Sequence, residues 1–508
     1  MSELQLELPE RVPGKASELV LYPESVHTIA GSDLSLVRIG NEKYLLIRSG
    51  NGAFPDGFKG ETWNDEDQTW MLCELTPDHA FALRNHFDFA RPKLMGKADS
   101  YGFGDRLGNA GAAHLSSLNG SHFRPVLAQQ SIRELTRTNR TPTDVIDAAT
   151  WAVFERGYHE GYGADGDHLK SESDIDLMMK AGYTMLTIDP SDHVVNRAKE
   201  MSEEELDAAF RKLPWTALDE SPEAWLERIL SLKVELEDGY KLTFDERAVK
   251  ESMVKYGRVI THTRKLVRHL EEAWPDREVE LELSVDETDE PTTLTEHYLV
   301  ASELDRLGVS LISLAPRFCG DFEKGIDFKG DLEQFRKEYI QHLAIAGRYG
   351  GYKLSIHSGS DKFAVYRVIG SLRKGAVHVK TAGTSYLEAL RTVAASNPDL
   401  FREILAFSLG RFDEDRETYH ISARTEKVPE PDSLSDDALA GLLDDDDARQ
   451  VLHVTYGSVL SGEQPGSQHF REQIMETLAE NESLYNHYLI RHFHKHLDPF
   501  ATSETDRA

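Results

Sequence analysis

The 508-residue sequence contains only two cysteines, Cys73 and Cys319, which are too few for a disulfide framework. It also has no run of about 18 apolar residues, the minimum that a membrane-spanning helix needs. The first residues, Met-Ser-Glu-Leu, are acidic, whereas a signal peptide begins with basic residues and an apolar stretch. These absences predict a cytoplasmic protein with no membrane partner.

Basic residues are scarce relative to acidic ones. The chain has 57 Lys and Arg against 88 Asp and Glu, which gives a formal net charge of −31. A field of this sign argues against nucleic acid as a partner. It does not exclude a small anionic substrate, because a local group of cations can dominate the field inside a cavity.

From about residue 122 the chain alternates between strand and helix patterns. Expected strands begin near residues 123, 158, 183, 279, 309, 352, 376 and 451, and each is followed by a helical pattern. Eight such units predict an α/β fold, a closed (β/α)8 barrel of the TIM type, with a doubly wound open sheet as the alternative. The last of these strands is expected at Val451–Tyr456.

The remaining segments are expected to be attachments to this barrel. Residues 1–95 have the pattern of short strands separated by turns, which predicts a small N-terminal α+β elaboration of a catalytic domain at 96–508. The glycine-rich segment 96–120 is expected to be a loop that covers one end of the barrel. We also expect a helical insertion at about 191–277 and an acidic, turn-rich insert at about 412–447.

Polar side chains gather where the expected strands end, whereas the strand interiors are expected to be apolar. Period-two alternation places Lys353, Ser355 and His357 on one face of a single strand. A buried strand rarely carries a cation, a hydroxyl and an imidazole on one face, because each must be paired or hydrogen-bonded. The active site of a (β/α)8 barrel lies at the C-terminal ends of its strands, so these groups indicate a catalytic function there.

Two imidazoles and a carboxylate are the candidate metal ligands. His168, Glu287 and His357 belong to the expected second, fourth and sixth strands, and residues of alternate strands share layers inside a barrel. This ligand set suits one divalent cation: Zn, Mn, Fe, Co or Ni. Asp286 and Asp167 are rival ligands, and a hydrogen-bonded rim without metal is the alternative.

Several cations and one amide are expected to bind a substrate at the same end of the barrel. The candidates are Arg317, Lys380, Lys170, Lys353 and Gln130. We expect Arg317 or Lys380 to bind a substrate carboxylate, because a buried cation needs a counter-charge. Lys380 is alternatively a Schiff-base lysine, if burial lowers its pKa.

The sequence resembles the tagaturonate epimerase family from about residue 100 to the C-terminus. This resemblance implies a metal-dependent barrel epimerase that acts on a ketohexuronate. The stretches that carry it are Ala164-Asp-Gly-Asp-His-Leu-Lys170, Ser284-Val-Asp-Glu-Thr288, Ser313-Leu-Ala-Pro-Arg-Phe318 with Phe322-Glu-Lys-Gly325, Tyr352–Phe363, His378-Val-Lys-Thr-Ala-Gly-Thr-Ser-Tyr386 and His453-Val-Thr-Tyr-Gly457.

That family interconverts tagaturonate and fructuronate. These two sugars differ at a carbon β to the ketone, where the carbonyl does not acidify the hydrogen. We therefore expect retro-aldol and aldol steps, in which a divalent cation stabilises an enediolate as a Lewis acid. Asp167 and Glu134 are the candidate acid–base groups for the two faces, with Asp189 as a further candidate. A metal-dependent class II-type aldolase or ketose isomerase and a non-catalytic carbohydrate-binding barrel are the alternatives, because a shared fold does not decide between them.

Overall fold

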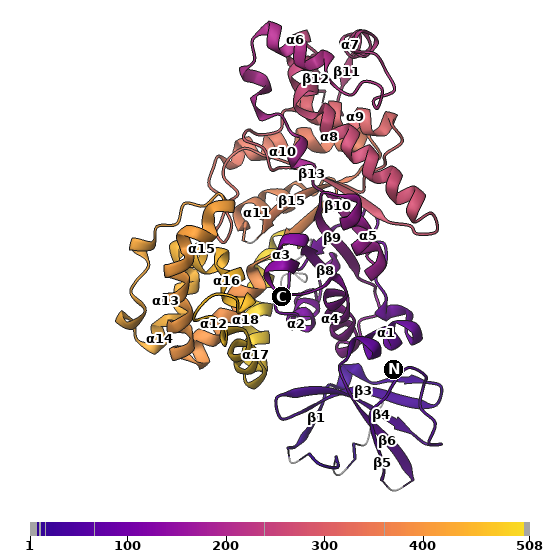
Figure 1. Cartoon of the computed structure of the whole chain (residues 1–508), viewed down its shortest axis with the longest axis vertical. Helices are drawn as coiled ribbons and strands as arrows, with labels where there is room; N and C mark the ends of the chain where they lie inside the picture. The colour runs from indigo at the N-terminus through magenta and orange to yellow at the C-terminus, as the bar shows by residue number, and fades with distance from the viewer. Residues whose placement is uncertain are drawn as a thin grey trace.

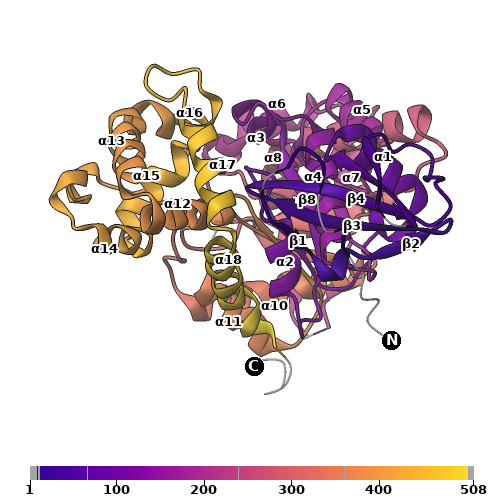
Figure 2. The ribbon, with the colours of Figure 1, turned by 90° about the horizontal axis from the view of Figure 1, so that it is seen from below.

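The computed structural model describes residues 8–501 except residues 10, 11, 16, 66, 238 and 360. Figure 1 shows an N-terminal sheet at the bottom of the view, a central barrel, and C-terminal helices beside the barrel. In Figure 2, seen from below, these C-terminal helices lie to one side of both the sheet and the barrel. No helix in the described part of the chain combines the length and the apolar character needed to cross a bilayer.

The N-terminal sheet is antiparallel, with strand order β1-β3-β4-β6-β5 and with β2 paired to β3. A two-residue turn at Gly40-Asn41 joins two of its strands, and Gly40 has the positive φ (64°) that such tight hairpins require. Helix α1 (Pro77–His86) connects this sheet to the barrel. The strands are β1 (Leu19–Leu21), β2 (His27–Ile29), β3 (Ser32–Ile39), β4 (Glu42–Ser49), β5 (Glu61–Asp65) and β6 (Gln68–Glu74).

Eight parallel strands close into the central barrel, and β16 pairs with β7 at the closure. This confirms the predicted (β/α)8 barrel and excludes the open doubly wound sheet. In order around the barrel the strands are β7 (Ser100–Gly102), β8 (Arg124–Ser131), β9 (Gly163–Leu169), β10 (Met185–Ile188), β13 (Glu280–Val285), β14 (Ser313–Pro316), β15 (Lys353–Gly359) and β16 (Val377–Thr381).

The sequence prediction missed the first strand of the barrel and placed an eighth strand where the chain is helical. The first strand, β7, lies in the glycine-rich segment that was expected to be a loop. The expected last strand is helical, because residues 451–456 belong to α15 (Asp446–Val454) and α16 (Tyr456–Ser461). The predicted second, fourth and sixth strands are therefore the third, fifth and seventh of the barrel, but they still alternate around it.

One further strand is displaced from its predicted position. The strand expected at Tyr158–Ala164 is β9, Gly163–Leu169, so Asp165 and Asp167 belong to the strand itself and not to the loop after it. Gly166 allows a close approach there, because a Cβ on it would lie 2.7 Å from Cγ of Met178 on the covering helix α5 (Glu172–Ala181).

Helices cover the outside of the barrel, and their ends follow local capping rules. Helix α5, for example, begins with a capping box between Ser171 and Asp174. The covering helices are α2 (Gly111–Ser117), α3 (Ile132–Arg137), α4 (Pro142–Glu155), α5 (Glu172–Ala181), α8 (Glu246–Ala273), α9 (Leu294–Arg306), α10 (Leu332–Arg348), α11 (Phe363–Leu372) and α12 (Thr384–Ser396).

Two groups of elements extend the barrel. Between β10 and β13 the chain forms α6 (Glu203–Arg211), α7 (Pro222–Leu230), the hairpin β11 (Val234–Glu235) and β12 (Lys241–Leu242), and α8, all near the top of Figure 1. After α12 it continues through α13 (Pro398–Asp415), α14 (Asp436–Leu439), α15, α16, α17 (Phe470–Glu480) and α18 (Glu482–Leu497), which pack beside the barrel.

The inside of the barrel is polar, in contrast to the apolar strand interiors expected from the sequence. Inward-facing positions carry ionisable side chains along the whole length of several strands. Glu280, Glu282, Lys353, His378 and Lys380 are all buried there. Each buried charge must be paired or hydrogen-bonded. Lys380 forms an ion pair with Glu282 across the barrel, whereas Glu280 accepts hydrogen bonds from backbone N–H groups and Lys353 donates to a carbonyl and a hydroxyl.

Candidate active site

A cavity of ≈ 510 Å³ opens at the C-terminal ends of the barrel strands, which we call the mouth of the barrel. Its wall includes His168 from β9, Asp286 and Glu287 after β13, Arg317 after β14 and His357 from β15. A smaller adjoining cavity of ≈ 50 Å³ reaches inward. This is the position at which active sites of (β/α)8 enzymes lie.

His168 has a strained backbone at the end of β9, with a φ of 55°, which is rare for residues other than glycine. This conformation breaks the alternation of the strand, so that Asp167 and His168 both face the mouth. Nδ1 of His168 lies 2.9 Å from Oδ1 of Asp167, and Nε2 lies 3.7 Å from Oε1 of Glu287. Burial disfavours the charged imidazole, but the carboxylate of Asp167 outweighs it and raises the pKa of His168.

His168, Asp189 and Glu287 each offer one ligand atom, and these atoms all lie within 4.8 Å of one another. Two of the three expected ligands, His168 and Glu287, are therefore adjacent. Asp189, which was expected as an acid–base group, completes this donor group in place of His357. Asp189 also accepts a hydrogen bond from the backbone N–H of Ser191 (2.9 Å).

His357 lies beside this group, with its ring centroid 5.4 Å from that of His168. Its Nε2 contacts Oε1 of Glu282 at 2.6 Å. Its buried Nδ1 has no hydrogen-bond partner among the residues that the structure describes, and it lies 3.5 Å from Oδ1 of Asp286. Burial opposes the charge of this imidazole, but Asp286 and Glu282 raise the pKa of His357 to about 10.

These nitrogens and carboxylates fit a divalent cation. A metal-bound histidine usually donates its second ring N–H to a carboxylate, and the contact between His357 and Glu282 has this form. The unpartnered Nδ1 of His357 then faces Asp286 on the wall of the cavity. The residues that could hold a metal are His168, Asp189, Glu287, His357 and Asp286, a mixed imidazole and carboxylate set.

Lys380 occupies the centre of the barrel below the mouth. Its Nζ lies 2.7 Å from Asp165, 2.9 Å from Asp167 and 2.7 Å from Glu282. Burial alone would lower the pKa of Lys380, but these carboxylates raise it well above its usual value. The lowered pKa that a Schiff-base lysine needs is therefore absent, and three carboxylates of the protein already surround this ammonium group.

The pKa values of Asp167 and Asp165 shift in opposite directions, although both carboxyl groups contact Lys380. Burial disfavours the charge of Asp167, but His168 and Lys380 outweigh it and hold the pKa of this carboxyl well below its usual range. Burial dominates at Asp165 and raises its pKa to about 6, although Lys380 opposes the shift. Asp167 is therefore ionised at neutral pH.

Two of the expected substrate-binding residues are not at the mouth. Lys353 begins β15 at the opposite end of the barrel, where Nζ donates to the carbonyl of Gly96 and to Oγ of Ser100, both at 2.9 Å. Burial lowers the pKa of Lys353. Gln130 faces away from the barrel interior and donates to the carbonyl of Asp105 (3.2 Å).

Lys170 lies at the rim of the mouth. Its ammonium group donates to Oδ1 of Asp192 (2.9 Å) and to Oγ of Ser191 (3.0 Å), and lies 3.9 Å from Asp189. Because its side chain is about two-fifths exposed (42%), this cation is more solvated than the buried groups of the site.

Three cations on the wall of the larger cavity have no carboxylate partner among the described residues: Arg317, Arg133 and Lys324. The guanidinium of Arg133 stacks over the ring of Tyr419, 5.2 Å from its centroid. Unpaired cations are unusual in a chain with so large an excess of acidic residues. The cavity is therefore suited to an anionic group.

Glu134 enters the smaller cavity from α3, on a different element from Asp167. Its Oε1 accepts a hydrogen bond from Nε of Arg106 (2.9 Å), and Arg106 in turn stacks on the ring of Tyr456 (3.5 Å to the centroid). Two carboxylates, Glu134 and Asp167, therefore line one small space.

Sequence reasoning missed several residues of the site. Gln129, adjacent to the predicted Gln130, faces inward and contacts Asp167 (3.4 Å), because the register of β8 places the preceding residue inside. Glu282 and Asp165 lie inside strands that were expected to be apolar. Arg133 lies on α3 next to the predicted Glu134, and Lys324 lies in the loop after β14 on the same cavity wall as Arg317. Alternation along strands cannot predict residues of a helix or a loop.

The arrangement combines metal donors, ionised carboxylates and unpaired cations. Such a site can hold a divalent cation, bind a polar anion and exchange protons with it. These properties are compatible with a metal-assisted reaction on a polar anionic substrate.

Comparison with known proteins identifies relatives along almost the whole chain. The family model described as tagaturonate epimerase matches residues 22–500. The tagaturonate/fructuronate epimerase of Thermotoga maritima is 42% identical over 460 residues, 90% of this chain and 92% of the relative.

Solved structures give the same result. The fructuronate-tagaturonate epimerase of Cohnella laeviribosi with one glycerol superimposes with a TM-score of 0.88 and 40% identity, covering 95% of this chain and 96% of that one. Its native structure gives a TM-score of 0.87 with the same coverage. On the family match and the extent of these likenesses, the chain belongs to the tagaturonate epimerase family.

Proposed function

We propose that this protein interconverts D-tagaturonate and D-fructuronate with the help of one divalent metal ion. The observation that carries this proposal is the combination, in one cavity, of a metal-donor group with three unpaired cations. The curated relative named for this activity supports the choice of substrates.

The chemistry of the substrates determines which reaction the residues must support. The two uronates differ at a carbon β to the ketone, so direct removal of its hydrogen would face a high barrier. In a retro-aldol step a base removes the proton of the hydroxyl on that carbon, and the electron pair of the neighbouring C–C bond passes to the ketone half. This gives an aldehyde and an enediolate. Addition of the enediolate to the other face of the aldehyde forms the epimer and returns the proton.

His168 and Glu287, with Asp189 or His357 as further donors, would hold the metal ion in this scheme. When bound, a divalent ion of the Zn, Mn, Fe, Co or Ni class supplies Lewis acidity to the oxygens on which negative charge develops. Glu282 would orient His357 through its contact with Nε2.

Asp167 and Glu134 are the proposed acid–base pair. Proton transfer on two faces of an aldehyde requires groups on two sides of it. Asp167 belongs to β9 and Glu134 to α3, and both line the smaller cavity. Asp189, which lies in the donor group, is the alternative base.

Arg317 is the proposed ligand of the substrate carboxylate, with Arg133 and Lys324 nearby on the same wall. A planar guanidinium can bind a carboxylate through two parallel hydrogen bonds, which fixes orientation as well as charge. This orientation would hold the carboxylate-bearing half of the sugar within the site while the C–C bond is broken.

The decisive experiment uses substrate deuterated at the carbon that is inverted. In the retro-aldol route this deuterium stays on carbon, so the product should retain it fully while epimerisation proceeds. Loss of the deuterium to water at the rate of epimerisation would overturn the mechanism and favour direct proton abstraction. Analysis of the same reaction for free aldehyde separates an epimerase, which releases none, from an aldolase.

A further inference from the structure

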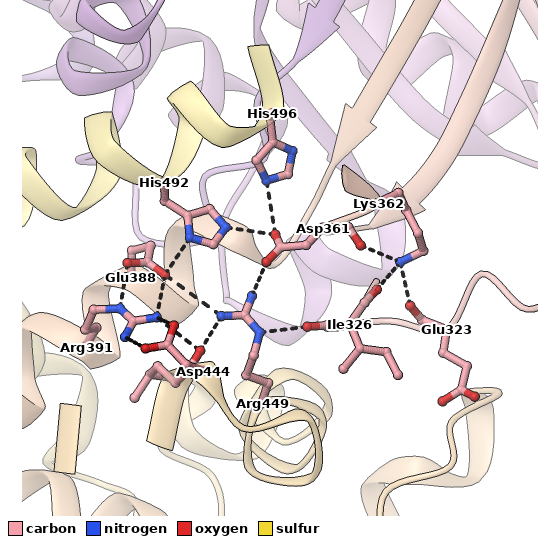
Figure 3. Close-up of polar contacts among 12 residues, drawn as sticks. Glu323, Ile326, Asp361, Lys362, Glu388, Arg391, Asp444, Arg449, His492 and His496 are labelled. Carbon is pink, nitrogen blue, oxygen red and sulfur yellow. Dashed lines mark hydrogen bonds and ion pairs between the residues drawn. The ribbon is translucent and has the colours of Figure 1, made fainter. Parts of the chain in front are cut away.

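A second group of histidine and carboxylate side chains lies away from the mouth, where α18 packs on the barrel (Figure 3). We propose that Asp361, His492 and His496 form a structural site for a divalent transition-metal ion. Asp361 lies between β15 and α11, and the two histidines lie on α18. None of the three belongs to the cavity of the candidate active site.

The spacing of the ligand atoms supports this proposal. His492 and His496 are four residues apart on one helix, so their side chains lie on the same face one turn apart. Their Nε2 atoms lie 2.9 Å and 3.1 Å from the same oxygen, Oδ1 of Asp361. Ligand atoms bound to one zinc ion at about 2.0 to 2.1 Å lie roughly 3.3 Å apart in a tetrahedral site, so only small movements would admit an ion.

The atoms of these three side chains that point away from the proposed ion, Nδ1 of each histidine and Oδ2 of Asp361, already have partners. Nδ1 of His492 faces Oε1 of Glu388 (3.1 Å), and Nδ1 of His496 faces the hydroxyl of Tyr101 (2.7 Å). Oδ2 of Asp361 accepts a hydrogen bond from Arg449 (2.7 Å). Second partners of this kind orient metal ligands and leave both Nε2 atoms and Oδ1 directed at one point.

The charged groups around this point also suit a bound cation. Asp361, Glu388 and Asp444 are three carboxylates, whereas Arg391 and Arg449 supply two guanidinium groups to them. Asp444 is largely exposed and can be solvated, whereas His492 lies between the buried carboxylates of Asp361 and Glu388. Two imidazoles and a carboxylate are the ligands preferred by Zn²⁺ and its neighbours in the first transition row.

The three ligands are all buried, which is typical of structural ions rather than catalytic ones. They join α18 to the loop after β15, and through Glu388 and Arg449 they also reach α12 and α15. An ion at this point would therefore fasten the last long helix of the chain to the barrel.

The test measures zinc bound to the purified full-length protein and locates it by anomalous scattering at the zinc edge in crystals. We expect an anomalous peak between Asp361, His492 and His496 in the unmodified protein. The variant His492→Gln should lose one equivalent of zinc per chain, whereas His494→Gln, on an exposed position of the same helix, should lose none.

A variant of the mouth, His168→Asn, separates this proposal from the proposed function, because it should retain the equivalent bound by Asp361, His492 and His496. A zinc-soaked crystal of the unmodified protein without density at this point would overturn the proposal and assign the cluster to protons alone. Unchanged zinc content in a folded His492→Gln variant would overturn it as well.

Discussion

At the scale of single residues, the backbone of His168 makes a sharp test of metal binding possible. Its positive φ is tolerated by asparagine better than by most residues. His168→Asn should therefore keep the fold, remove an imidazole donor and lower both turnover and metal content, turnover by roughly 100-fold or more. Steady-state assays and metal analysis check this.

The matched control is His420→Asn, because His420 lines the same cavity but its side chain is 80% exposed. The His420→Asn substitution should leave turnover and metal content unchanged. Normal metal content in His168→Asn would remove this histidine from the donor group.

The proposed carboxylate contact of Arg317 predicts a selective effect on substrate binding. Arg317→Lys keeps the charge but loses the two-pronged geometry. We expect KM for uronates to rise about 10-fold or more, since a hydrogen bond to a charged group contributes about 1.5–3 kcal/mol. KM for the corresponding neutral ketoses should hardly change, and an equal rise for both would argue against the contact.

His114 on α2 predicts a loss of stability in acid. It is buried, its Nε2 contacts Oγ of Ser385 (2.7 Å), and its ring stacks on Phe103. Burial lowers the pKa of His114 to about 4, whereas an unfolded histidine titrates near 6.5. The unfolded chain therefore binds this proton first, so the stability contribution is complete above pH 6.5 and declines as the pH falls toward 4.

Denaturant titrations at several pH values measure this effect. Replacing His114 by Gln should reduce the slope of unfolding free energy against pH between 6.5 and 4 by up to about 1.4 kcal/mol per pH unit. An identical slope in the variant would show that another group carries the titration.

The sequence predicted the location of the site at the mouth better than it predicted the placement of individual side chains. His168, Glu287 and Arg317 line one cavity, and Asp189 lies beside His168 and Glu287, because the ends of parallel strands converge in any closed barrel. Gln130 was wrong by one position, since a shift of one residue moves a side chain to the other face of a strand. Lys353 shares a face with His357, but it lies at the other end of that strand.

At the scale of secondary-structure elements, two helical glycines predict opposite effects of the same substitution. A Cβ on Gly370 of α11 would lie 2.0 Å from the carbonyl oxygen of Pro499, whereas one on Gly410 of α13 would meet nothing within 4 Å. Gly410→Ala should stabilise the protein by about 0.5–1 kcal/mol through helix propensity.

Gly370→Ala should destabilise it by about 1–3 kcal/mol, because the C-terminal turn at residues 498–500 must move away. Thermal and denaturant unfolding of the two variants provide the comparison. If both substitutions stabilised the protein, the turn at residues 498–500 would be able to move away from residue 370 without a loss of stability.

The elements themselves were predictable wherever hydrophobic patterns were long. The strands β13, β15 and β16 were each predicted to within one or two residues. The strand β7 has only three residues, Ser-Tyr-Gly, which is too short to show alternation. Residues 451–456 are apolar enough for a strand, but the charged residues before them at helical spacing begin α15, and tertiary packing continues the helix.

At the scale of the whole molecule, Lys43 joins three regions. From β4 its Nζ contacts Glu155 of α4 (2.7 Å) and Glu482 at the start of α18 (2.6 Å). Burial raises the pKa of Glu155, and Lys43 opposes this shift. Lys43→Met leaves both carboxylates without this cation, and we expect a loss of about 1–3 kcal/mol together with faster hydrogen exchange in β3 and β4.

Lys93→Met provides the control, because Lys93 pairs with the exposed Asp88 (2.8 Å) and such pairs contribute about 0–1 kcal/mol. Equal effects of the two substitutions would mean that Lys43 does not hold the N-terminal sheet against the barrel.

The closure of the barrel between β7 and β16 also has a consequence for biosynthesis. Ser100 and His378, which pair there, are 278 residues apart in the sequence. At roughly 5–20 residues per second a ribosome needs on the order of tens of seconds to synthesise the intervening chain. The strands of the N-terminal sheet all lie within residues 19–74, so this sheet can fold during that time, whereas one edge of β7 stays unpaired until β16 has been synthesised. Nascent chains that end before β16 therefore present an unpaired edge strand, and it is at this stage of synthesis that we expect chaperones to bind.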